Sequence, residues 1–185
     1  MDKETFKLLS KAYGPIVENI INQNVAFYNF NETIKWRFIY NEDISIVATC
    51  NRNDNHIEVN LKSFMNAYFD NDLKVIEYFL LHEIRHIFQH LIIFNYKNGL
   101  KVPVDVSIIK KWIFEQEHYI KALDENKKEN PDYFYQDSEL DAYAFSYAVM
   151  KYKYKTINVY VPPVYDRKFY SIVDDWIKYF HKNNI

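Results

Sequence analysis

The 185-residue sequence has little glycine, a single cysteine and almost no excess of charge of either sign. Only two glycines, beside abundant tyrosine and phenylalanine, favour a helix-rich fold with aromatic packing. The lone cysteine, Cys50, excludes an intrachain disulfide framework. A formal net charge of −2 provides no basic field that would call for direct binding of nucleic acid or of an anionic membrane.

The sequence also lacks a recognisable targeting or membrane-spanning segment. Its opening, MDKETFKLLS, has neither the basic start nor the apolar core of a secretory signal. No apolar run is long enough to span a bilayer. We therefore expect a cytoplasmic protein without a membrane partner.

The length predicts one domain that covers residues 1–185 and is large enough to bury a core. We expect residues 1–34 to form an N-terminal helical segment and residues 35–153 to form the core that carries the functional residues. Residues 154–185 are expected to be a C-terminal extension that ends in a helix.

Three short runs favour β-strands, because turns rich in asparagine and aspartate separate them. They predict a small antiparallel sheet. We expect its last strand to lie at an exposed edge, where an extended peptide could add through main-chain hydrogen bonds. The three runs are Lys35–Tyr40, Ile44–Cys50 and His56–Leu61, and the turns between them are Asn41–Asp43 and Asn51–Asn55.

Helical spacing of apolar residues predicts α-helix for most of the remaining chain. The longest predicted helix is capped at Asn71 or Asp72, ends near Tyr96 and packs on the sheet. The expected fold class is therefore α+β and mainly helical. The other predicted helices are 3–22, which is kinked or split at Gly14-Pro15, 103–125, one opened by a capping box of Ser138 and Asp141, and 166–182. Residues 62–70 are expected to form a short helix or loop. We also expect a solvated loop at 121–131 and an extended segment at 156–165.

The centre of the longest predicted helix reads FLLHEIRHIFQH and contains the pattern HExxH. His82 and His86 lie one turn apart on the same face, so both imidazoles can bind one Zn²⁺ at about 2.0–2.1 Å. Glu83 is expected to act as a general base. The alternative is that these are ordinary polar residues on a surface helix. Because the helix is apolar on nearly every side, polar groups at its centre would need partners such as a metal.

A catalytic zinc usually has a third protein ligand and one position for water. His90 is a poor candidate, because it lies about 12 Å along the helix axis from His82. Glu139 is a better one, since it falls in the first turn of a later helix whose alanines allow close packing. Asp141 is the substitute, and Glu139 could instead only complement the helix dipole.

Together these residues resemble the ImmA/IrrE family of gluzincin-type zinc peptidases, over residues 36–150. The resemblance implies a zincin-like fold with His82, His86 and Glu139 as zinc ligands and Glu83 as the base. It also implies a phage or mobile-element setting in which a regulator or repressor is cleaved. The matching positions are Ile57, Asn60, His82, Glu83, His86, His90, Glu139, Asp141, Ala142 and Phe145.

The expected activity is that of a zinc metalloendopeptidase acting on a protein or peptide substrate. Glu83 would take a proton from a zinc-bound water during its attack on a peptide carbonyl, and would pass it to the leaving amine. The developing oxyanion needs a hydrogen-bond donor besides the zinc. Tyr143, one turn after Glu139 on the same side, is the first candidate, and Tyr133, Tyr135, Tyr160, Tyr165 and His118 are the others.

Two further functions stay open. The first is a catalytically inactive zincin-like protein that binds a protein partner. It draws support from Arg85, where the family usually has glycine, and from Tyr143, where related enzymes often carry Asp or Asn. The second is a DNA-linked regulator. Since no helix-turn-helix or basic patch is apparent, a link to transcription would run through cleavage of a regulator.

Overall fold

The fold is that of a computed structural model, which describes residues 1–28, 33–51, 56–123, 128, 130–154 and 157–185. The chain divides into two compact units, one of Met1–Ile87 with Ile185 and one of Phe88–Asn184. The division falls inside the long helix α3 (Leu73–Lys97), which therefore contributes residues to both units. The single domain predicted from the length stays a prediction.

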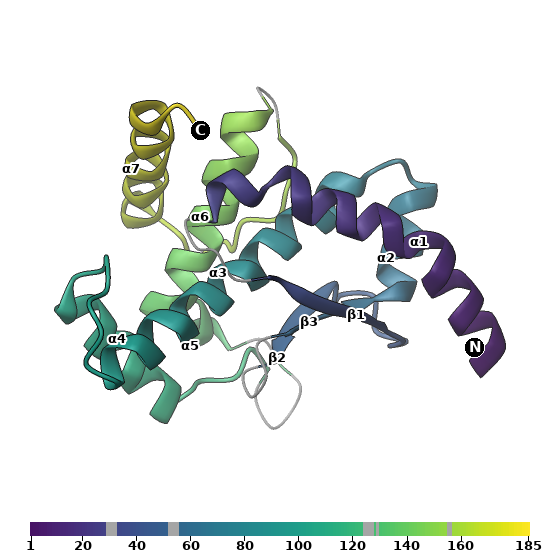
Figure 1. Ribbon diagram of the computed structural model, residues 1–185, viewed down its shortest axis with the longest axis horizontal. Coiled ribbons are helices and arrows are strands. Elements are labelled where there is room, and N and C mark those ends of the chain that lie inside the picture. Colours follow the sequence, from purple (N-terminus) through teal and green to yellow (C-terminus); the bar gives the residue numbers. More distant parts are fainter. Residues whose placement is uncertain (29–32, 52–55, 124–127, 129, 155–156) are drawn as a thin grey trace. The chain divides into compact units, whose positions relative to one another are not determined.

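Helices make up most of the described chain, with one small sheet, so the predicted α+β class is confirmed. Figure 1 labels the elements in chain order. The first unit contains α1 (Lys3–Gln23), a 3₁₀ turn η1 (Val25–Phe27), β1 (Lys35–Ile39), β2 (Ala48–Asn51), β3 (His56–Asn60), α2 (Leu61–Phe69) and the start of α3. The second contains the rest of α3, then α4 (Val106–Glu117), α5 (Pro131–Phe134), α6 (Asp137–Lys153) and α7 (Arg167–Asn183).

The sheet is mixed, so the prediction of an antiparallel sheet is wrong. Its strand order is β1-β3-β2, with β1 parallel to β3 and β2 antiparallel to β3. The prediction that β3 forms an edge is also wrong, because β3 is the central strand. Burial accounts for this position, since Ile57 and Val59 are fully buried whereas the strand predicted from Ile44 begins only at Ala48.

Asn60 holds the segment that connects β1 to β2. Its side-chain amide donates to the carbonyls of Asp43 (3.0 Å) and Ile46 (2.9 Å), and its Oδ1 accepts from the Asn41 amide (3.2 Å). These bonds hold residues 41–46 as a loop against the end of β3. The same Oδ1 accepts from the amide of Lys62 at 3.1 Å, so Asn60 also caps α2. Of the predicted turn Asn51–Asn55, residues 52–55 lie outside the described residues.

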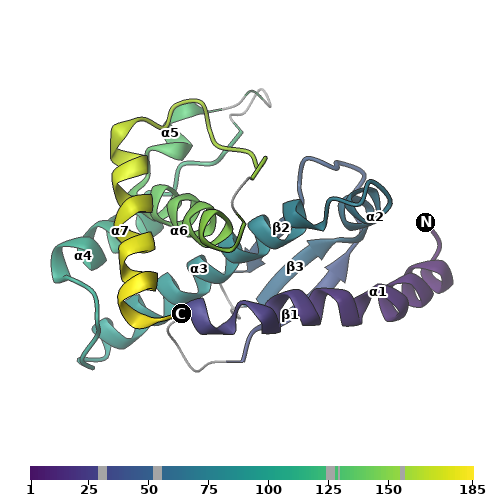
Figure 2. The ribbon, with the colours of Figure 1, turned by 90° about the horizontal axis from the view of Figure 1, so that it is seen from above.

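Helix α1 lies alongside the sheet in the first unit (Figure 2). Aromatic rings pack between α1, β1 and α2. The Phe64 ring lies 5.4 Å from the Tyr13 ring and 5.5 Å from the Phe38 ring, measured between centroids. Helix α1 is continuous through Pro15, so the predicted split does not occur. At its end the buried Asn24 amide donates to Glu77 Oε1 of α3 at 2.8 Å.

In the second unit α7 packs along α6 (Figures 1 and 2) and buries Phe169, Val173 and Phe180 completely. Helix α4 ends at Glu117, eight residues before the predicted end at Glu125. His118 leaves helical geometry at this point, and its ring bonds back to the carbonyl of Phe114 at 2.9 Å. Residues 157–165 form no strand. Of the predicted loop at 121–131, residues 124–127 and 129 lie outside the described residues, and so does residue 156 of the predicted extended segment. Across the described residues, none of the helices combines the length and apolar character needed to cross a bilayer.

Candidate metal centre

Two histidines at the middle of α3 face the same point. The Nε2 atoms of His82 and His86 lie 3.0 Å apart, and the two rings are nearly perpendicular. Two imidazoles bound to one tetrahedral ion at about 2.0–2.1 Å would have their nitrogens about 3.3 Å apart. Since His82 is only 3% exposed, this pair of nitrogens lies inside the protein. The spacing and the burial both suit a shared metal ion.

Glu139, in the first turn of α6, completes the group. His82, His86 and Glu139 each offer one ligand atom, and these atoms all lie within 4.8 Å of one another. Glu139 is 2% exposed. This buried group could hold a metal ion.

Hydrogen bonds inside the second unit explain how α6 brings Glu139 to α3. Gln89 Nε2 donates to the Ser138 carbonyl and to Asp141 Oδ2, each at 2.9 Å. These two hydrogen bonds hold α6 at positions on both sides of Glu139. Gln89 is 2% exposed and follows His86 by three residues, which is a rise of about 4.5 Å along one helix. The clamp therefore holds the first turn of α6, which carries Glu139, beside Gln89 of α3.

Tyr133 of α5 orients the Glu139 carboxylate. Its hydroxyl donates to Glu139 Oε2 at 2.6 Å, a short bond to a charged acceptor. Burial raises the pKa of Tyr133 far above its usual value, and the negative charge of Glu139 raises it further. The hydroxyl consequently keeps its proton and remains a donor.

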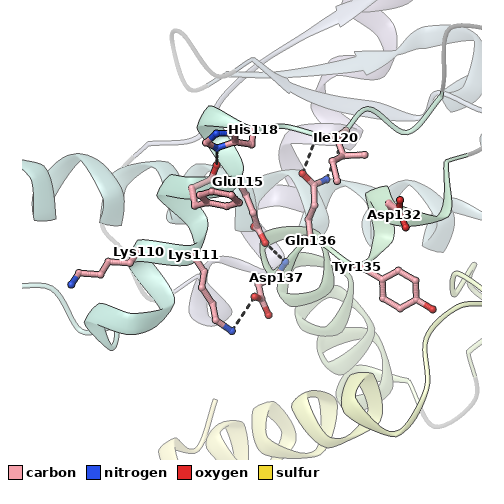
Figure 3. Close-up of a pocket in the computed structure, with 10 residues that line it drawn as sticks. Lys110, Lys111, Glu115, His118, Ile120, Asp132, Tyr135, Gln136 and Asp137 are labelled. Atoms are coloured by element: carbon pink, nitrogen blue, oxygen red, sulfur yellow. Dashed lines mark hydrogen bonds and ion pairs between the residues drawn. The ribbon is translucent and has the colours of Figure 1, made fainter.

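The N-terminus of α6 is held by Glu115 of α4 (Figure 3). The carboxylate of Glu115 accepts from the backbone amides of Asp137 and Ser138, the latter at 2.9 Å. The predicted capping box of Ser138 and Asp141 is therefore wrong, because the N-cap residue Gln136 makes no capping bond and the acceptor comes from another helix. Such a partner leaves no local signal in the sequence, and neither does Gln89.

Glu83 lies beside the histidine pair. Its Oε1 is 3.9 Å from His82 Nε2, and its side chain is mostly buried. The position of the predicted general base is thus within reach of a molecule held next to the two histidines.

The remaining predicted residues of the described structure do not belong to the ligand group. Tyr143 is buried in an aromatic cluster, with ring centroids 6.1 Å from Phe134 and 5.8 Å from Tyr165, and its catalytic role stays a prediction. Asp141 accepts from Gln89 and, like His90, does not belong to the group of possible ligands. His118 is exposed and stacks on Phe114.

An open groove of about 610 Å³ lies next to the α5–α6 corner, within the second unit (Figure 3). Its walls come from α4 and from the stretch that also carries Tyr133 and Glu139. Tyr135 lines the groove and is 61% exposed, in contrast to the half-buried Tyr133 two residues earlier. The groove is lined by Lys110, Lys111, Phe114, Glu115, His118, Ile120, Asp132, Tyr135, Gln136 and Asp137.

Comparisons of the chain with protein-family models, with curated proteins and with solved structures found no match. The resemblance to ImmA/IrrE peptidases and the zincin-like fold therefore stay predictions. The interpretation of the site rests on its own residues and distances.

Proposed function

We propose that this chain is a zinc metallopeptidase of the gluzincin type, similar to the ImmA/IrrE family, which hydrolyses peptide bonds of a protein substrate such as a regulator or repressor. The observation that carries the proposal is the buried group of His82, His86 and Glu139 with the Glu83 carboxylate beside it. Two imidazoles and one carboxylate are a known ligand set of catalytic zinc.

The donor set fits a borderline ion such as Zn²⁺ and leaves room for a water or a substrate. Three protein ligands on a four-coordinate ion leave one open position, which distinguishes a catalytic site from a closed structural one. Non-haem iron enzymes also use two histidines and one carboxylate. A glutamate directly after the first histidine, with its carboxylate 3.9 Å from the Nε2 of that histidine, favours hydrolysis instead.

A divalent ion in this group would supply a Lewis acid that lowers the pKa of a water molecule and polarises a peptide carbonyl. Glu83 then accepts a proton from the attacking water and returns it to the leaving amine. Because Glu83 is mostly buried, its carboxylate has less freedom to move than an exposed one would have. Tyr143 stays the first candidate for the oxyanion donor.

The first test is the metal content of protein purified without chelators. We expect close to one zinc per chain in the wild type and in the Glu83→Gln variant, and much less in a His82→Ala variant. Iron in place of zinc, or no bound divalent metal, would overturn the proposal.

The second test compares peptide-library cleavage, read by mass spectrometry, between wild type and Glu83→Gln. We expect specific products from the wild type and their loss in Glu83→Gln, because the variant keeps the ligands and lacks the base. Glu117→Gln, at an exposed position that ends α4, is the matched control and should cleave as the wild type does. A wild type that binds zinc and cleaves nothing, in the library or in a lysate, would instead favour the inactive partner-binding protein.

A further inference from the structure

We propose that Tyr133 is a positioning residue of the metal centre, which holds one oxygen of Glu139 so that the carboxylate ligates the ion through a single oxygen. This inference rests on the proposed metal site. It adds a residue that lies outside the HExxH pattern and outside the helix that carries Glu139.

The contact is built to orient a carboxylate. The Tyr133 hydroxyl donates to Glu139 Oε2 at 2.6 Å, and the two residues are six positions apart on different helices. A hydrogen bond from a fixed donor restricts rotation of the carboxylate about its last torsion, which is otherwise broad. The orientation of Glu139 is thus set before any ion binds.

The surroundings of Tyr133 keep the donor in place. Helix α5 is capped by Asn130, whose side chain accepts from the amide of Asp132 at 3.1 Å. The Tyr133 carbonyl accepts from Gln136 Nε2, also at 3.1 Å, and Gln136 is tied in turn to the backbone of Ile120. The Tyr133 ring packs edge-on against Phe134 and Tyr119. A ring held on several sides presents its hydroxyl in one direction.

The consequence concerns the coordination number. Two histidines and one carboxylate oxygen make three ligands and leave a position open, whereas a carboxylate that binds through both oxygens would crowd that position. Partners that orient ligands typically contribute about 10–100-fold to metal affinity. Tyr133 thus favours both tighter binding and an open site.

The test measures metal affinity without relying on activity. Metal-free wild type, Tyr133→Phe and Tyr135→Phe are titrated with Zn²⁺ against a chromophoric chelator, and their Co²⁺ complexes are compared by visible absorption. We expect Tyr133→Phe to bind Zn²⁺ about 10–100-fold more weakly and to show a shifted Co²⁺ spectrum. Tyr135→Phe is the matched control, since its hydroxyl belongs to the exposed groove, and it should stay within about twofold of the wild type.

A double-mutant cycle shows whether Tyr133 acts through Glu139. In a Glu139→Gln background the change Tyr133→Phe should weaken binding by much less than in the wild type. p-Aminophenylalanine at position 133, which restores a donor at the same place, should restore most of the affinity.

Three results would overturn the inference. Equal affinity of Tyr133→Phe and wild type would remove Tyr133 from the centre, and an undiminished effect in the Glu139→Gln background would show that Tyr133 does not act through Glu139. Both results leave the proposed metal site intact. A wild type that binds no Zn²⁺ would remove the metal site itself, together with this role for Tyr133.

Discussion

Replacing Gln89 by leucine should loosen the attachment of α6 to α3. Leucine has a similar size and lacks the amide, so the change removes the two 2.9 Å bonds to the Ser138 carbonyl and to Asp141. The bond to the carboxylate contributes about 1.5–3 kcal/mol and the bond to the carbonyl about 0.5–1.5 kcal/mol. Both acceptors are half-buried, so water replaces part of the loss. We expect the free energy of unfolding to fall by about 2 kcal/mol, or about thirtyfold in the unfolding constant.

The assay is urea unfolding of the metal-free protein, followed by circular dichroism. Gln116→Leu is the matched control, because Gln116 is exposed on α4 and its substitution should change the free energy of unfolding by less than about 0.5 kcal/mol. A loss in Gln89→Leu no greater than in the control would refute the role of Gln89 as a clamp.

The same variant tests the link from packing to the site. Since Ser138 and Asp141 flank Glu139, loosening them should misplace the third ligand and weaken Zn²⁺ binding by about tenfold. Reduced stability with unchanged Zn²⁺ affinity would show that Gln89 stabilises the second unit without positioning Glu139.

Two further predictions concern the fold. Asn60→Ala should lower the free energy of unfolding by about 3–4 kcal/mol, because the buried side chain makes four hydrogen bonds to backbone groups; a loss below about 1 kcal/mol in urea unfolding would contradict this. Burial alone would raise the pKa of Asp137, but Lys168 and Lys111 outweigh burial and hold the pKa below its usual value. Such a carboxylate stabilises the fold above the unfolded pKa of about 3.9 and loses this effect as the pH falls through its lowered pKa. Asp137→Asn should therefore cost about 0.5–1 kcal/mol at pH 7 and progressively less below pH 4, and a constant difference across that range would argue against the ion pairs.

Much of the local structure was predictable because its causes are local. The motif helix was expected between Asn71 and Tyr96 and runs as Leu73–Lys97, since a long apolar pattern bounded by capping and glycine signals is a strong helix signal. The end of α4 was missed, because the apolar spacing continues beyond the point at which His118 leaves helical geometry. The sequence predicted Glu139 as a ligand. It did not predict the contacts of Gln89 and Tyr133 that hold Glu139 in place.

By itself the sequence determined that His82 and His86 share a helix face with Glu83 beside them, because the period of a helix fixes which residues are neighbours. Only the tertiary structure decided that β3 is central, that Glu115 caps α6, and that Gln89 and Tyr133 hold the turn that carries Glu139. Gln89 and Asp141 are 52 residues apart. A contact between residues so distant in the chain leaves no periodic pattern, so the packing of the helices selects it.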